Sequence, residues 1–340
     1  MKKFVTIILI AIFSAAMYAG DPARKGTTGA EQLLIPVGAR GISTGGAFLS
    51  NLTGIESIYY NPAGLDRSGG AEAMFNYMNY IADINVSYFG ASTQLGDFGS
   101  IGLTFKFLDF GDIPITTAEF PDGDGRTYSP SFLTMGLTYS KVLTDRISVG
   151  TNFKLINETI ENTSATGFAI DFGVQYRFSP QLSIGATLKN IGPNMRYAGA
   201  ELQGRTQVPG TDPGSPPGNY EIVAEEFQIP SYFSLSGAYN YSVNEQNDIL
   251  VGGAFIANNS LEDAVNLGLE YGFMKTLFLR GGYNFALGGE SENSLFGFTV
   301  GAGVNYSIGS GVGVSFDYAF RDVKEFPTPN HIFTVKMFFE

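Results

Sequence analysis

From residue 73 to the C-terminus, apolar side chains alternate with small or polar ones. The clearest example is the segment 168–178, where every second residue is aromatic or branched aliphatic (Phe168, Ile170, Phe172, Val174, Tyr176 and Phe178). A period of two indicates β-strands whose two faces meet different surroundings. The pattern predicts about 14 strands, at residues 73–80, 84–94, 99–108, 131–141, 146–157, 165–178, 181–191, 230–241, 247–257, 263–272, 276–285, 294–306, 311–321 and 331–339.

The lengths of these segments and of their connections favour a membrane barrel. Most segments are close to the roughly 9 to 11 residues that a tilted transmembrane strand needs. The longest connections, 109–130 and 192–229, follow the third and seventh strands, whereas connections after even-numbered strands are short. Outer-membrane barrels alternate short periplasmic turns with longer extracellular loops. We therefore predict an all-β fold, an antiparallel transmembrane β-barrel over residues 73–340, in the bacterial outer membrane.

The first twenty residues have the layout of a secretory signal. Lys2 and Lys3 precede the apolar run 4–13, and small residues follow up to Ala19 and Gly20. Ten strongly apolar residues are too few for a membrane-spanning helix, which needs about 20. We expect residues 1–20 to be a signal peptide.

Residues 21–72 do not alternate and contain few bulky apolar side chains. Such a segment cannot bury enough apolar surface to fold alone. The glycines between residues 38 and 46 allow close packing of backbone, and the turn at 61–64 leads toward the first strand. We predict that this segment is a plug, or hatch, in the barrel lumen, where irregular backbone is shielded from lipid.

The composition limits the partners and the kinds of functional site that the chain can have. Twenty basic against 32 acidic residues give a net charge of −12, which argues against a nucleic-acid partner because binding to phosphates needs a basic surface. The chain has no Cys and a single His. Thiolate metal sites and Cys nucleophiles are therefore excluded, and one His is too few for a metal site that needs several imidazole ligands. We expect no enzymatic activity, no cofactor and no metal.

Few charges fall on the predicted inner face, and two pairs of them are placed by register. We expect the turn at 179–181 to keep the apolar residues of the strands on either side of it on the same face. The two residue numbers of each cross-strand pair then add up to 360, and Asp171 stands opposite Lys189. By the same logic, Glu270 and Arg280 share the inner face across a later turn. Directly opposed side chains are close enough for salt bridges. These charges either pair with each other and with the plug, or line a path for a ligand or cargo.

Three runs within residues 31–67 stand out, at 33–41, 45–48 and 60–65. Through these runs the segment resembles the PorV/PorQ group of outer-membrane proteins, a branch similar to the FadL-like fourteen-stranded barrels. The resemblance implies an N-terminal hatch whose motif residues are Gly38, Arg40, Gly41, Gly45, Gly46, Asn61, Pro62, Ala63 and Gly64. It also implies a role either in passage of hydrophobic small molecules or in type IX secretion, through contact with cargo signals.

We predict transport of hydrophobic small molecules across the outer membrane, which would need an apolar pocket beside the hatch and a break in the wall. The alternatives are a type IX secretion accessory that binds protein cargo at the cell surface, and a structural outer-membrane protein. The expected partners are outer-membrane lipid and either a hydrophobic ligand or a secreted protein. The alternation that ends at Phe339 is similar to the signal read by the barrel-assembly machinery, although Glu340 extends it by one residue.

Overall fold

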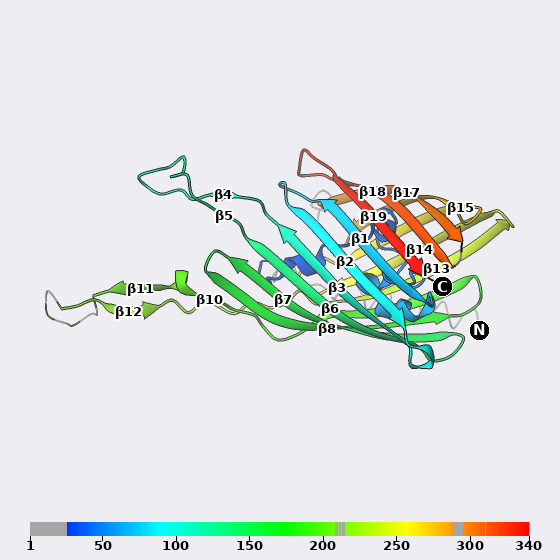
Figure 1. Ribbon diagram of the computed structural model, residues 1–340, viewed down its shortest axis with the longest axis horizontal. Coiled ribbons are helices and arrows are strands. Elements are labelled where there is room, and N and C mark those ends of the chain that lie inside the picture. Colours follow the sequence, from blue (N-terminus) through cyan, green and yellow to red (C-terminus); the bar gives the residue numbers. More distant parts are fainter. Residues whose placement is uncertain are drawn as a thin grey trace.

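The structure is a computed structural model that describes residues 26–207, 210, 212, 215–287, 295–309 and 311–339. Fourteen antiparallel strands close into one barrel, because β1 pairs with both β2 and β19 while β9 pairs with β8 and β13 (Figure 1). The wall strands are β1 (Ala71–Asn79), β2 (Asn85–Gln94), β3 (Ser100–Asp109), β6 (Ser131–Val142), β7 (Ile147–Ile160), β8 (Thr163–Arg177), β9 (Leu182–Ile191), β13 (Tyr232–Asn244), β14 (Asn247–Asn258), β15 (Ala264–Phe273), β16 (Leu277–Ala286), β17 (Phe296–Gly309), β18 (Val312–Val323) and β19 (Asn330–Phe339). The predicted fold class and strands are confirmed.

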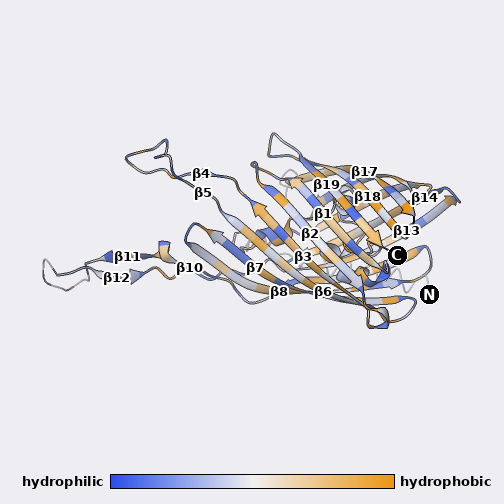
Figure 2. Ribbon diagram, in the orientation of Figure 1, coloured by the Kyte–Doolittle hydropathy of each residue, from blue (hydrophilic) through white to orange (hydrophobic). Residues whose placement is uncertain are grey.

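The two faces of the wall differ as the alternation predicted. In β8, Phe172 and Val174 point outward and are about half exposed, whereas Asp171 and Gly173 point inward and are buried. Apolar residues therefore cover the outside of the wall. Figure 2 shows the hydrophobic residues, in orange, recurring along the wall strands. An outward apolar band is what the hydrocarbon interior of a membrane requires.

Both long connections leave the barrel at the same end, which we call the long-loop end (Figure 1). One carries the ribbon of β4 (Ile113–Pro114) and β5 (Thr127–Tyr128), and the other carries β10 (Tyr197–Gly199), η5 (Ala200–Leu202), β11 (Gln203–Thr206) and β12 (Gly218–Glu221). The sequence pattern did not predict these short strands. The opposite end has short turns, including η4 (Gly96–Phe98). The alternation of long and short connections is thus present.

The segment before β1 lies inside the barrel, and we call residues 29–70 the plug. It contains the short helices η2 (Glu31–Leu34), α2 (Ala39–Ser43), α3 (Ser57–Tyr60) and η3 (Pro62–Arg67). Helix α2 packs against β16–β19 and η3 packs against β3 and β6–β8, so the plug contacts opposite parts of the wall. None of the helices in the described part of the chain has the length and apolar character needed to cross a membrane. The predicted signal peptide, residues 1–20, lies outside the described residues.

Candidate functional site: the plug and the cavity above it

The turn at Asn61 attaches the plug to the wall. Asn61 Oδ1 accepts a hydrogen bond from the N–H of Ala63 at 3.1 Å and so caps η3. Asn61 Nδ2 donates to the carbonyl oxygen of Val174 in β8 at 3.0 Å. Pro62 occupies the start of η3, where its missing N–H costs nothing. These motif residues therefore both start the helix and bind it to the barrel.

The five predicted plug glycines all lie inside the barrel, and two of them show why glycine is needed there. Gly38 has a φ of +86°, a conformation that side chains disfavour, and its N–H donates to Asn76 Oδ1 in β1 at 3.1 Å. A Cβ atom at Gly41 would lie 2.2 Å from the ring of Tyr60. The remaining three are Gly45, Gly46 and Gly64. Small residues thus let the plug backbone approach itself and the wall.

Arg40 connects the plug to the wall through a buried network of charges. Arg40 Nε lies 2.9 Å from Glu270 Oε2, and Arg280 Nε lies 2.6 Å from the same oxygen. Arg280 Nη1 in turn lies 2.5 Å from Asp317 Oδ1. Glu270 and Arg280 are directly paired across β15 and β16, in the register that the sequence predicted. Two guanidinium groups and two carboxylates therefore compensate one another at the plug surface.

The predicted salt bridge between Asp171 and Lys189 is wrong, although both side chains are in the lumen as expected. The register sum of 360 is present from Phe172 to Arg177, but it shifts at Asp171, where two residues of β9 oppose one of β8. This is a β-bulge, which re-aims the side chains next to it. Asp171 instead lies 2.6 Å from Lys154 Nζ, and Lys189 donates to the carbonyl oxygen of Tyr59 in the plug.

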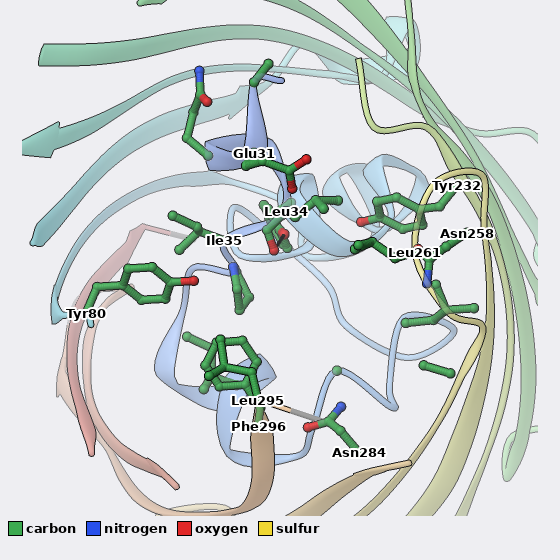
Figure 3. A pocket seen from close by; sticks show the side chains of 18 of the residues that line it. Glu31, Leu34, Ile35, Tyr80, Tyr232, Asn258, Leu261, Asn284, Leu295 and Phe296 are labelled. Carbon is green, nitrogen blue, oxygen red and sulfur yellow. Dashed lines mark hydrogen bonds between the residues drawn. The ribbon is translucent and has the colours of Figure 1, made fainter. Parts of the chain in front are cut away.

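A cavity of about 1000 Å³ lies between the plug and the wall at the long-loop end. Tyr80 and Tyr232 point into it from opposite sides of the barrel, with Leu34 and Ile35 of the plug between them (Figure 3). Much of the lining is aliphatic and aromatic, and three carboxylates belong to it, those of Glu31, Glu158 and Glu262. Its size and apolar character are typical of sites for hydrophobic ligands.

Arg321 is a buried cation in the lining of this cavity. Its guanidinium carbon lies 3.8 Å from the centre of the Phe296 ring, and its Nε has no hydrogen-bond partner among the described residues. No carboxylate of the described residues lies within salt-bridge distance of it. A buried guanidinium without an acid is costly, so it offers an anchor for a polar or acidic group entering the cavity.

Sequence reasoning missed these cavity residues. Tyr80, Tyr232 and Arg321 stand at or beside strand ends, and the alternation places such residues on one face of a strand. No local pattern shows that the plug leaves a cavity beside them. The cavity exists because the plug does not fill the lumen at the long-loop end, which is a property of the assembled fold.

Fold and site together define a plugged β-barrel of the bacterial outer membrane with an apolar cavity facing the long loops. The model of a family described as type IX secretion system membrane protein PorP/SprF matches residues 56–337, and the chain belongs to this family. The PorV/PorQ group, which the plug residues resemble, is not the family that matches. The two agree at the level of an outer-membrane barrel.

Solved structures share the fold at low sequence identity. The Pseudomonas putida toluene transporter TodX is 13% identical with a TM-score of 0.57, covering 89% of this chain and 96% of TodX. A Pseudomonas aeruginosa FadL homologue is 11% identical with a TM-score of 0.56, covering 90% and 98%. The CymD monoaromatic hydrocarbon channel is 10% identical with a TM-score of 0.54, covering 89% and 97%. No curated relative matches the chain by sequence.

Proposed function

We propose that the protein is an outer-membrane component of type IX secretion, and that its cavity receives an apolar part of a secreted partner. The family supports the first part of this proposal. The observation that carries the second part is the placement of the cavity, which lies among the long loops and has the plug as its floor. Apolar side chains entering from the outside would be buried there, and Arg321 would face a polar or acidic group of the same partner.

The attachment of the plug favours binding over passage. Arg40 is paired with Glu270 of the wall, Asn61 is bonded to β8, and Phe48 and Ile55 are completely buried. A molecule passing through the barrel would have to break these contacts. A partner docking from outside would leave them in place.

Uptake of hydrophobic small molecules is the second candidate function. The apolar lining of the cavity favours it, and barrels of the same fold include proteins described as hydrocarbon channels and a toluene transporter. A molecule that passes the plug would require the plug to move, so that a route opens from the cavity toward the short-turn end of the barrel. This route and docking from outside therefore differ in whether the plug is fixed.

A reversible lock on the plug separates these two functions. Ser50 of the plug and Ser183 of β9 have their hydroxyl oxygens 3.5 Å apart, and the natural chain contains no Cys. In the double variant Ser50→Cys/Ser183→Cys, oxidation would fasten the plug to the wall and reduction would release it. We expect oxidised cells to secrete type IX substrates normally, with each single variant as the control. Uptake of labelled toluene that stops on oxidation would instead support transport.

Filling the cavity tests the docking site itself. Ala286 lines the cavity, whereas Ala91 of β2 is exposed on the outer face. We expect Ala286→Trp to reduce secretion of type IX substrates at equal barrel abundance, and Ala91→Trp to leave it unchanged. Normal secretion by the Ala286→Trp variant would show that the cavity is not the docking site.

A further inference from the structure

We propose that a second, much smaller cavity on the other side of Tyr59 binds one small anion of the size of chloride. This cavity has a volume of about 30 Å³ and lies between the plug and the inner faces of β2, β3 and β6–β9. Its charged lining residues are Lys106, Lys154, Lys189 and Asp171. The site is separate from the large cavity of the proposed function.

The charges around this cavity do not balance. Lys106, Lys154 and Lys189 are all buried, and Asp171 is the single carboxylate that lines the cavity with them. When all three lysines are protonated, the three ammonium groups and the one carboxylate carry an excess of two positive charges. Excess charge in a buried place is strongly unfavourable unless an opposite charge compensates it.

The remaining partners of the lysines are neutral. Lys106 Nζ donates to the carbonyl oxygens of Gln32 at 2.6 Å and Ile35 at 3.1 Å. Lys189 Nζ donates to the carbonyl oxygen of Tyr59 and lies 4.0 Å from the centre of its ring. Carbonyl groups and rings orient an ammonium group without cancelling its charge. Since each ammonium group has three N–H donors, Lys106 retains one for a further acceptor.

Two hydroxyl groups supply the second observation. Tyr88 Oη and Thr134 Oγ1 both belong to residues that line the cavity, are buried, and have no hydrogen-bond partner among the described residues. A buried hydroxyl without a partner is costly. An anion would accept from both hydroxyls and compensate the ammonium groups, while Asp171 stays engaged with Lys154 at 2.6 Å.

The size of the cavity selects the ligand. A volume of about 30 Å³ is enough for one water molecule or for one monatomic anion, and too small for a carboxylic acid or a phosphate ester. Lys106 and Lys189 hold carbonyl groups of the plug, so an anion between them would strengthen the attachment of the plug to the wall. The inferred role of the ion is therefore to stabilise the plugged state.

Thermal unfolding of the purified barrel in sodium chloride and in sodium gluconate, at equal ionic strength, tests the proposal. We expect the unfolding temperature to rise with chloride and to saturate, bromide to act like chloride, and gluconate to have no such effect. A crystal grown with bromide should show anomalous scattering in the cavity. Equal unfolding temperatures in the two salts would mean that the cavity holds only water, and would overturn the proposal.

Matched variants locate the effect. Thr134→Val removes a hydroxyl from the cavity with little change in shape, and we expect at least a tenfold weaker chloride dependence. Thr187→Val is the control, because the Thr187 hydroxyl is also buried without a partner among the described residues but does not line this cavity. Lys106→Met should abolish the dependence. If that variant fails to fold, the comparison of Thr134→Val with Thr187→Val tests the site. An equal chloride response in these two variants would contradict it.

Discussion

A charged residue in the lumen is stabilised when a residue of opposite charge lies beside it. Glu270 illustrates this, because it compensates Arg40 of the plug and Arg280 of the wall at the same time. A buried charge that loses its partner is much more costly than an exposed one. The sequence predicted the pair of Glu270 and Arg280 from register alone, whereas the third member, Arg40, comes from a segment 230 residues away.

Replacing Glu270 by Gln should therefore destabilise the barrel strongly. The substitution leaves the buried guanidinium of Arg280 and the partly buried one of Arg40 with Asp317 as the one carboxylate within salt-bridge distance among the described residues, and we expect a loss of about 3 to 5 kcal/mol in the free energy of unfolding. Denaturant titration in detergent would measure it. Asp124→Asn is the control, because it breaks a pair with Arg126 in an exposed loop and should cause no measurable change. Equal effects of both variants would contradict the network.

The charge state of Glu56 makes stability depend on pH. Burial, the largest effect, raises the pKa of this plug carboxyl; Lys336 lowers it, Asp317 raises it, and the N–H of Gly41 lowers it, with a net rise above 4.5. Because the folded-state pKa of Glu56 is raised, the contribution of this one carboxyl to stability is fully present below about pH 4.5 and is lost as pH rises through the folded pKa. In Glu56→Gln this contribution is absent. We expect the unfolding temperature of the variant to rise relative to wild type between pH 4 and pH 8, and a constant difference would contradict the assignment.

Among the elements, the strands next to the plug are shaped to receive it. Gly150 in β7 and Gly173 in β8 are paired across the wall, and Cβ atoms there would lie 2.4 Å from the backbone of Pro62 and 2.1 Å from Asn61 Oδ1, respectively. The sequence places glycine on the inner face of many strands, but it does not say which of these glycines contact the plug. That distinction depends on where η3 rests.

A methyl group at Gly150 should therefore disturb the plug. We expect Gly150→Ala to cost about 1 to 3 kcal/mol, the usual range for overpacking, and to speed proteolysis of the plug. Gly237→Ala is a matched strand variant, because its Cβ would have no neighbour closer than 3.9 Å. A measurement of unfolding temperature and of protease sensitivity compares the two. Indistinguishable variants would show that η3 does not rest on Gly150.

At the scale of the whole molecule, wall and plug have different requirements. The wall strands pair with one another all around the barrel, so their backbone groups are satisfied without the plug. The plug, by contrast, consists of short helices whose apolar and charged residues find their partners on the wall. The barrel should therefore exist without the plug, whereas the plug should not exist without the barrel.

Deletion of residues 31–66 tests this asymmetry. We expect the shortened chain to insert into the outer membrane and to keep the heat-dependent gel mobility of a barrel. Its unfolding temperature should be lower and its conductance in planar bilayers higher, because the lumen is emptied. Unchanged conductance together with unchanged stability would contradict the plug, and recovery of the full-length chain in a soluble form would contradict the membrane barrel.

The sequence by itself determined the wall: the number of strands, their ends to within three residues, the face toward lipid and the alternation of long and short loops. These features are local, since side chains on a strand alternate with a period of two and every wall strand meets lipid on one side. It also set residues 21–72 apart from the wall, because that segment lacks this period.

Only the tertiary structure decided what the lumen contains. At the β-bulge opposite Asp171, Lys189 donates to Tyr59 of the plug and not to its predicted partner. The sequence of β9 contains no pattern that predicts the extra residue of this bulge. Arg321 and the large cavity depend on where the plug stops, and the small cavity depends on three lysines from three different strands. Contacts between segments far apart in the chain arise from packing in three dimensions, which local periodicity does not encode.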